Sequence, residues 1–301
     1  MAEEKIVLVT GAGSGIGRAV AESAARAGHI VYAAMRAIRG RNRDRADALA
    51  KLAAAEGWRL FPIELDVLSD ASCREAVDQV LLEQGRLDVL VNNAGMLMAG
   101  IAEAFTPEQM TKVLETNAVS WLRVNRAVLP VMRRQEKGLL VYIGSTTSRL
   151  NEPFIALYVA SKAAGEALAE SMSFELTPFG IETVIVVPGA FTSGTEHFNH
   201  ANPPASEAVV QQYGDLPLLF ATLGEKIAAI DAENGGGIGV NSVGAEVART
   251  IGLPHGSRPL RLVVDPQEKG MAEINSVTQD KQRDFFRRLG IEHLMVVGRP
   301  R

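Results

Sequence analysis

The stretch TGAGSGIG at residues 10–17 directly follows the apolar run KIVLVT at 5–10 and directly precedes the helical pattern RAVAESAARAG. A glycine-rich turn between a strand and a helix lets the backbone approach a phosphate closely, and the helix N-terminus offers N–H groups and a favourable dipole. Glycine also serves tight turns that bind nothing, because it adopts positive φ freely. The position of this turn, after the first strand and before a helix, predicts a site for the pyrophosphate of a dinucleotide.

Short apolar runs rich in β-branched residues recur along the chain, separated by longer segments of helical periodicity. They lie at 5–10, 29–34, 58–65, 87–92, 138–144, 181–187 and 260–264. This alternation predicts βαβ units. With right-handed crossovers it favours an α/β fold of the Rossmann-like, doubly wound kind, with a mainly parallel seven-stranded sheet flanked by helices. A closed (β/α)8 barrel is the alternative, and it would need an eighth unit.

The rhythm of strands breaks between 187 and 260, where no convincing strand pattern occurs. We interpret residues 191–257 as a helical lid over the ligand, inserted in a single catalytic domain of residues 1–265. Residues 266–301 carry one helical pattern and form a C-terminal extension, the helical tail. A group of large side chains in the lid indicates a partly apolar substrate, although packing of the lid would explain them equally well: Phe191, Phe198, Tyr213, Leu216, Leu218, Leu219 and Phe220.

Composition narrows the function classes. The 301 residues carry a formal net charge of −4, so nothing indicates a basic surface for nucleic acid. No apolar run reaches the roughly 18 residues that span a membrane. Cys73 is the one cysteine, which excludes an internal disulfide, and we expect it to be buried. The first residues lack the pattern of a secretory signal. We therefore expect a cytoplasmic protein with no nucleic-acid or membrane partner.

Five arginines crowd the segment MRAIRGRNRDR at 35–45. In a dinucleotide fold the second strand ends beside the adenine ribose, where an acidic residue would bind the hydroxyls and repel a 2′-phosphate. Here no acid ends the strand, and Arg36 follows it directly. Since a guanidinium binds phosphate through charge-assisted hydrogen bonds, Arg36 predicts NADP(H) as the cofactor. Arg39, Arg41, Arg43 and Arg45 are interpreted mainly as a solvated loop and helix start.

Three more clusters follow predicted strands, at the edge where such a ligand would lie. Asp66, with Val67 beside it, follows the third strand and offers a carboxylate to an adenine amino group. The sequence NNAG at 92–95 follows the fourth strand, with Asn93, Ala94 and Gly95 beside the ribose. Ser145 ends the fifth strand, and the sequence YVASK follows at 158–162.

The spacing of Tyr158 and Lys162 places both on one face of a helix. A nearby ammonium favours the phenolate and is expected to lower the pKa of the phenol. Ser145 would hold a substrate oxygen beside that phenol. A proton would then pass between Tyr158 and this oxygen while a hydride moves to or from nicotinamide.

TGAGSGIG, NNAG, Asn117, Ser145, YVASK and Pro188-Gly189 occur in the order found in classical short-chain dehydrogenases/reductases, which the chain resembles over about residues 5–190, with the strand at 260–264. The resemblance implies a catalytic tetrad of Asn117, Ser145, Tyr158 and Lys162. It implies interconversion of a ketone or aldehyde and an alcohol. It also implies a cofactor site that includes the following residues: Gly11, Ser14, Gly15, Ile16, Gly17, Arg36, Asp66, Val67, Asn93, Ala94, Gly95, Tyr158, Lys162, Pro188, Gly189 and Thr192.

Two departures from the family pattern bear on these expectations. Many NADP-dependent members have a basic residue in the glycine turn where this chain has Ser14, so the NADP(H) prediction rests on Arg36. The tail after 265 is longer than in compact members, whose C-terminus often helps a tetramer. We expect a homo-oligomer, either a dimer or a tetramer. The alternatives are an NAD-preferring dehydrogenase, a non-catalytic nicotinamide-sensing protein, and an epimerase or dehydratase of the extended branch, whose turn and larger C-terminal domain are lacking here.

Overall fold

The computed structural model describes residues 3–191, 194–196, 200–234 and 239–297. Seven strands form one sheet in the order β3-β2-β1-β4-β5-β6-β7, and every neighbouring pair is parallel. This confirms the predicted doubly wound sheet and excludes the barrel. The strands are β1 Ile6–Thr10, β2 Ile30–Met35, β3 Leu60–Glu64, β4 Val89–Asn92, β5 Gly138–Ile143, β6 Ile181–Pro188 and β7 Arg261–Val264.

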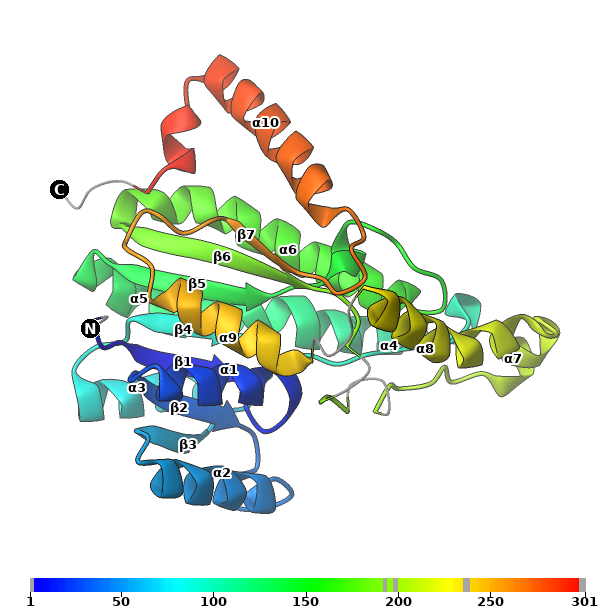
Figure 1. Ribbon diagram of the computed structural model, residues 1–301, viewed down its shortest axis with the longest axis horizontal. Coiled ribbons are helices and arrows are strands. Elements are labelled where there is room, and N and C mark those ends of the chain that lie inside the picture. The colour runs from blue at the N-terminus through cyan, green and yellow to red at the C-terminus, as the bar shows by residue number, and fades with distance from the viewer. Residues whose placement is uncertain (1–2, 192–193, 197–199, 235–238, 298–301) are drawn as a thin grey trace.

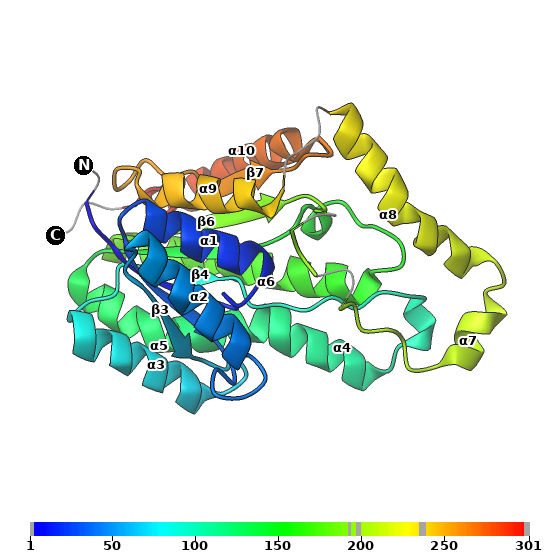
Figure 2. The same ribbon diagram turned by 60° about the horizontal axis from the view of Figure 1, so that its bottom comes forward.

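Helices cover both faces of the sheet, as Figures 1 and 2 show from two directions. One face packs against α1 Gly15–Arg26, α2 Arg43–Glu56 and α9 Val240–Ile251. The other packs against α3 Asp70–Gln84, α5 Ser120–Gln135 and α6 Ala156–Leu176. Along β1, Ile6 and Leu8 join one apolar cluster while Val7 and Val9 join the other. Strands buried on both faces need apolar residues at every position, which is why their sequences do not alternate with polar residues.

The remaining helices lie beyond the carboxyl ends of the strands. They are α4 Pro107–Leu114, the π-helical turn η2 Glu115–Val119, α7 Glu207–Gln212 and α8 Leu216–Glu233. In both ribbon views α7 and α8 project away from the end of the sheet. No strand is found among the described residues between β6 and β7, as predicted. The predicted lid segment also contains α9, however, which packs on α1 and belongs to the layer covering the sheet.

The C-terminal tail forms α10 Met271–Leu289 and the short 3-10 helix η5 Glu292–Met295. It folds back beside α6 (Figure 1), where Phe286 meets Phe174 edge to face with ring centroids 4.8 Å apart. The Thr177 hydroxyl donates a hydrogen bond to the carbonyl oxygen of Leu294 at 2.9 Å. Other short 3-10 helices span Ala102–Ala104, Thr146–Ser148 and Thr177–Phe179. Among the described helices, none is long and apolar enough to cross a membrane.

Candidate active site

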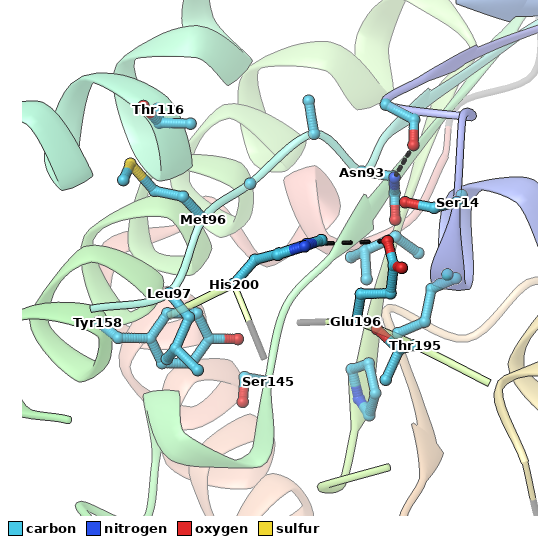
Figure 3. Close-up of a pocket in the computed structure, with 18 of the residues that line it drawn as sticks. Ser14, Asn93, Met96, Leu97, Thr116, Ser145, Tyr158, Thr195, Glu196 and His200 are labelled. Carbon is cyan, nitrogen blue, oxygen red and sulfur yellow. Dashed lines mark hydrogen bonds and ion pairs between the residues drawn. The ribbon is translucent and has the colours of Figure 1, made fainter. Parts of the chain in front are cut away.

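A cleft of about 860 Å³ runs along the carboxyl ends of the strands. The glycine turn lines one end and Tyr158 lies at the other, so the topology brings distant motifs to one site. Figure 3 shows Ser14 and Asn93 at the first end and Tyr158 with Ser145 at the second. Open parallel sheets bind ligands at this edge, where the strand order reverses. That reversal lies here between β1 and β4.

The glycine turn is packed against the fourth strand. Gly11 and Gly15 have φ of +66° and +55°, and α1 begins at Gly15 after an extended Ser14. The Asn93 amide nitrogen donates to the carbonyl oxygens of Thr10 at 2.9 Å and Gly11 at 3.2 Å. A Cβ atom on Gly17 would lie 2.2 Å from that nitrogen. The glycines therefore allow the NNAG segment to hold the turn, and Ile16 lines the cleft beside it.

Arginines line the cleft where β2 ends. Arg36 and Arg41 are exposed there, as is Arg45. Glu64, at the end of β3, accepts hydrogen bonds from the backbone N–H groups of Ala37 at 2.6 Å and Ile38 at 2.9 Å, so its carboxylate orders the segment after Arg36. The sequence indicated that the arginines after Arg36 lie mainly in a solvated segment. In the structure two of them, Arg41 and Arg45, line the cleft as well.

Thr195 and Glu196, from the segment after β6, lie against the glycine turn and the arginine-rich segment. Arg45 forms an ion pair of 2.9 Å with Glu196, from the segment that follows β6. His200 lies 3.7 Å from the same carboxylate, as Figure 3 shows. A Cβ on Gly15 would lie 3.1 Å from the Thr195 hydroxyl oxygen. Arg45 of the arginine-rich segment is thus paired with Glu196 of the same chain.

Asp66 and Val67 line the cleft after β3. The Asp66 carboxylate accepts a hydrogen bond from the Leu68 N–H at 3.0 Å, and the Asp66 N–H donates to Ser72 at 2.9 Å. Ala94 and Gly95 continue the lining after β4. Asp66 therefore caps its own loop and still lines the cleft, where its carboxylate stays available to a ligand.

Ser145 and Tyr158 form the polar centre of the cleft. The Ser145 hydroxyl oxygen accepts hydrogen bonds from the Thr147 hydroxyl at 2.9 Å and the Thr147 N–H at 3.2 Å. Tyr158 is 9% exposed and Ser145 is 7% exposed. The Ser145 side chain acts to lower the pKa of the Tyr158 phenol. The structure thus brings together the serine and the tyrosine that the sequence placed 13 residues apart.

Lys162 lies under this pair. Its ammonium donates a hydrogen bond to the carbonyl oxygen of Ile143 at 2.7 Å and stands 5.8 Å from the centre of the Tyr158 ring. Burial lowers the pKa of Lys162 to about 8, while the charge of Glu166 acts to raise it. Burial raises the pKa of Tyr158 to about 12, opposed by the Ser145 hydrogen bond. The expected lowering of the phenol pKa is therefore not found, because desolvation of an enclosed phenol outweighs the favourable contacts.

Asn117 lies in the π-helical turn between α4 and α5 and is fully buried. Its amide accepts a hydrogen bond from the Met96 N–H at 2.8 Å and donates to the Met96 carbonyl at 2.9 Å and to the Ser161 hydroxyl at 2.9 Å. Both amide hydrogens are thereby used within the protein. The side chain holds the segment after NNAG against α6, and its part in a proton relay stays a prediction.

The segment after β6 closes the far wall of the cleft. Pro188 and Gly189 line it. Gln267, from the loop after β7, accepts a hydrogen bond from the Ala190 N–H at 2.7 Å and donates to the Ala190 carbonyl at 2.8 Å. Its amide nitrogen also donates to Asp231 on α8. Thr192, which the sequence assigned to the cofactor, lies outside the described residues.

Of the large side chains predicted in the lid, few line the cleft. Phe191 is buried and lines it. Phe220 packs on Phe154, and the Tyr213 hydroxyl donates to Glu103 at 2.6 Å. Three leucines are exposed on α8: Leu216, Leu218 and Leu219. Phe198 lies outside the described residues. Other apolar side chains also line the cleft: Met96, Leu97 and Ile155 from outside the lid, and Ile227 from α8.

Sequence reasoning missed three polar residues of the site, namely Glu166, Gln267 and Lys269. The Lys269 ammonium pairs with Glu152 at 2.8 Å and donates to the Thr146 hydroxyl oxygen at 3.2 Å. Glu166 had a signal in the sequence, because it follows Lys162 by the same four residues that separate Lys162 from Tyr158. Gln267 and Lys269 had none, because they reach the site only through the return of the chain after β7.

Comparison with known proteins agrees with the fold and the site described above. The sequence pattern of the family described as short chain dehydrogenase matches residues 5–204. The 3-ketodihydrosphingosine reductase of Bacteroides thetaiotaomicron is 36% identical over 192 residues, which are 64% of this chain and 66% of that protein, so the match spans just under two thirds of the reductase. A short-chain dehydrogenase of Streptomyces avermitilis has a TM-score of 0.73 at 30% identity, with 96% of each chain covered.

A gluconate 5-dehydrogenase of Burkholderia cenocepacia, solved with NADP and tartrate, has a TM-score of 0.67 at 26% identity and covers 87% of this chain and 94% of its own. The match of the family pattern to about two thirds of the chain, the seven-stranded sheet and the Ser145–Tyr158–Lys162 cluster all agree. The chain belongs to the short-chain dehydrogenase family of oxidoreductases.

Proposed function

We propose that this protein is an NADP(H)-dependent oxidoreductase that interconverts a ketone or aldehyde and an alcohol, with Tyr158 as the acid and base. The observation that carries the proposal is that Ser145, Tyr158 and the buried Lys162 line one cleft, with Ser145 acting to lower the pKa of the phenol and the Lys162 ammonium one helical turn away. Ser145 and Tyr158 together can hold one carbonyl oxygen. In reduction the phenol gives its proton to that oxygen, and in alcohol oxidation it takes the proton back.

The residues of the cleft fit a nicotinamide dinucleotide. The glycine turn leaves backbone N–H groups at the start of α1 for a pyrophosphate. The cleft has a volume of about 860 Å³, which lies in the usual range for a ligand site. We propose that the turn, Asp66, Val67 and the NNAG segment hold the nucleotide, with Lys162 and the Pro188–Gly189 turn toward the nicotinamide. When bound, the nicotinamide supplies or accepts the hydride.

The charge at the β2 end supports NADP(H) over NAD(H). Arg36, Arg41 and Arg45 all line the cleft there, and the nearby Glu64 carboxylate is bonded to backbone N–H groups. We propose that Arg36 binds the 2′-phosphate. Charge-assisted hydrogen bonds of this kind contribute roughly 1.5 to 3 kcal/mol, or about 10- to 100-fold in affinity.

Tyr158→Phe tests the acid and base role. Loss of NADPH absorbance is followed with benzaldehyde, cyclohexanone and ethyl acetoacetate as probe carbonyl compounds, and NADPH binding is titrated by fluorescence. We expect kcat to fall by about 10²- to 10⁴-fold while NADPH affinity is retained. Tyr213→Phe is the matched control, because Tyr213 does not line the cleft and its phenol donates a hydrogen bond to Glu103. An unchanged kcat in Tyr158→Phe would refute the assignment.

Arg36→Ala tests the cofactor preference by itself. We expect its affinity for NADPH to fall by about 10- to 100-fold and its affinity for NADH to change far less. Arg39→Ala is the matched control, since Arg39 is exposed in the same loop but does not line the cleft. Equal losses for both cofactors would refute Arg36 as the residue that binds the 2′-phosphate.

The remaining proposals concern the substrate and the setting of the protein. We propose a small, partly apolar carbonyl or alcohol substrate, because Leu97, Ile155 and Phe191 line the cleft near Tyr158. The half-exposed Val119 and Leu122, at the start of α5, support a homodimer through this helix. The division into a catalytic domain of 1–265 and an extension of 266–301 also stays a proposal. The buried thiol of Cys73 agrees with a cytoplasmic location.

A further inference from the structure

Glu166 is a buried carboxyl directly beneath the catalytic cluster. It follows Tyr158 and Lys162 at intervals of four residues on α6, which places all three on one face of the helix. The side chain is 2% exposed. Its Oε1 atom accepts a hydrogen bond from the backbone N–H of Ser145 at 3.0 Å. The carboxyl therefore touches the chain at the residue that holds the phenol.

The end of β5 is shaped to admit this carboxyl. A Cβ atom on Gly144 would lie 2.2 Å from Oε1 of Glu166, so the carboxyl would have to move from its present position. Gly144 itself is fixed by its N–H, which donates to the carbonyl of Val186 at 2.8 Å. Glycine at this position and glutamate on the helix thus depend on each other, and the Ser145 turn rests on the carboxyl.

Burial of a carboxyl normally calls for a cation, yet the nearest arginines bond a different residue. Arg149 and Arg261 both form ion pairs with Glu170, one turn further along α6, at 3.2 and 2.6 Å. The Lys162 ammonium donates to Ile143 instead. Burial raises the pKa of Glu166, and the Ser148 side chain, the Ser145 N–H and the charges of both arginines oppose this only in part. Burial of a carboxylate without a directly paired cation costs free energy of folding, and this cost points to a role of this carboxyl in the site.

We propose that Glu166 is a positioning residue for the reaction at Tyr158: its carboxyl holds the Ser145 turn in place, and its charge sets the pH range in which the Tyr158–Lys162 pair works. This inference rests on the acid and base role proposed above for Tyr158. It adds a residue one helical turn beyond the lysine to the working unit of the site.

The charge acts on both members of the pair in the same direction. An ionised Glu166 raises the pKa of the Tyr158 phenol and also that of the Lys162 ammonium. Both groups then keep their protons to higher pH. The other charged groups around the cluster are Lys162 and Glu170 on α6, Arg149 and Glu152 before it, Arg261 on β7 and Lys269 after it. Glu152 also raises the pKa of Tyr158 but is paired with Lys269.

Two substitutions separate the hydrogen bond from the charge. Glu166→Gln keeps an oxygen acceptor for the Ser145 N–H and nearly the same volume, but it removes the charge. Glu166→Ala removes both. Glu175→Gln is the matched control, since it makes the same chemical change at an exposed position of the same helix. Each variant is assayed for oxidation of cyclohexanol with NADP⁺ between pH 6 and pH 11, or with the alcohol of whichever probe compound is turned over fastest.

We expect the pH at which kcat reaches half its maximum to fall by roughly 0.5 to 1 pH unit in Glu166→Gln, with KM for NADP⁺ unchanged. Glu166→Ala should lose at least about tenfold in kcat, because the Ser145 turn is released. Glu175→Gln should match the wild type. A Glu166→Gln profile that superimposes on that of the wild type, or a Glu166→Ala variant with full kcat, would overturn the proposal.

A readout without turnover keeps the two proposals distinguishable. Tyrosinate absorbance is titrated in each variant and again with Tyr158→Phe added, so that the difference reports Tyr158 alone among the four tyrosines. The phenol of Glu166→Gln should ionise at lower pH than that of the wild type. If the wild type turns over none of the probe compounds but the phenol still ionises at lower pH in Glu166→Gln, the result counts against the proposed function and supports the role of Glu166. If the phenol ionises at the same pH in both proteins, the role of Glu166 is refuted.

Discussion

Replacement of Gly17 by alanine should damage both the fold and the cofactor site, because the glycine turn has no room for a methyl group. The new Cβ would lie 2.2 Å from the Asn93 amide nitrogen and 2.5 Å from the Gly11 carbonyl oxygen, and the second of these belongs to the backbone. Displacing the amide removes its hydrogen bonds to Thr10 and Gly11, at about 1 kcal/mol each. Overpacking adds about 1 to 3 kcal/mol.

The helix propensity of alanine returns about 1 kcal/mol of this loss. We therefore expect Gly17→Ala to lower the free energy of unfolding by about 2 to 4 kcal/mol, measured by urea titration with tryptophan fluorescence. NADPH affinity, titrated on the folded variant, should fall as well, since the turn that Asn93 holds is displaced.

Two controls sharpen the result. Gly224→Ala changes an exposed glycine on α8 with no atom within 4 Å of the new Cβ, so it should be neutral or stabilise by up to about 1 kcal/mol. The pair Gly17→Ala and Asn93→Ala should cost less than the two single changes added together, because the alanine at 93 removes one of the clashing groups. A Gly17→Ala protein with the stability and NADPH affinity of the wild type would refute the reasoning.

Three further outcomes are expected. Between pH 8 and pH 10 the free energy of unfolding of the wild type should rise by about 2 kcal/mol relative to that of Lys162→Met. The reason is that an unfolded lysine with its ordinary pKa of 10.5 binds more protons than the buried lysine, whose pKa is about 8. Parallel urea titrations of the two proteins across this range check the sign. Gln267→Ala removes both hydrogen bonds to Ala190, so amide exchange at residues 189–191 should speed up by about 30-fold, and unchanged exchange would show that the clamp is dispensable. Burial raises the pKa of the Cys73 thiol to about 11, so a disulfide reagent should modify it only after urea unfolds the chain; rapid reaction with the native protein would contradict its burial.

The sequence predicted the strands and the motifs because their signals are local. The run KIVLVT is apolar at nearly every position since β1 is buried on both faces, and the glycine turn follows it without a gap. Tyr158 and Lys162 share a helix, so their spacing alone places them together. The lid was recognised from the missing strand, but α9 could not be told from α8 by pattern, because whether a helix lies on the sheet depends on its tertiary contacts.

What the sequence could not show depends on contacts between distant segments. Gln267 reaches Ala190 across 77 residues, and Arg45 reaches Glu196 across 151 residues. The rise in the pKa of Tyr158 also escaped prediction, because it follows from how completely the site is enclosed rather than from which residues are near. Glu166 could have been suspected from its spacing, yet an ordinary solvated glutamate would have the same spacing.

The amide of Gln267 joins two parts of the molecule that would otherwise be free to diverge. It holds Ala190 at the wall of the cleft, and it donates to Asp231 on α8. A replacement of α8 that left Gln267 without this partner would therefore also disturb the segment at Ala190. Anyone grafting the corresponding helix of a relative onto this scaffold should carry residues 231 and 267 across together.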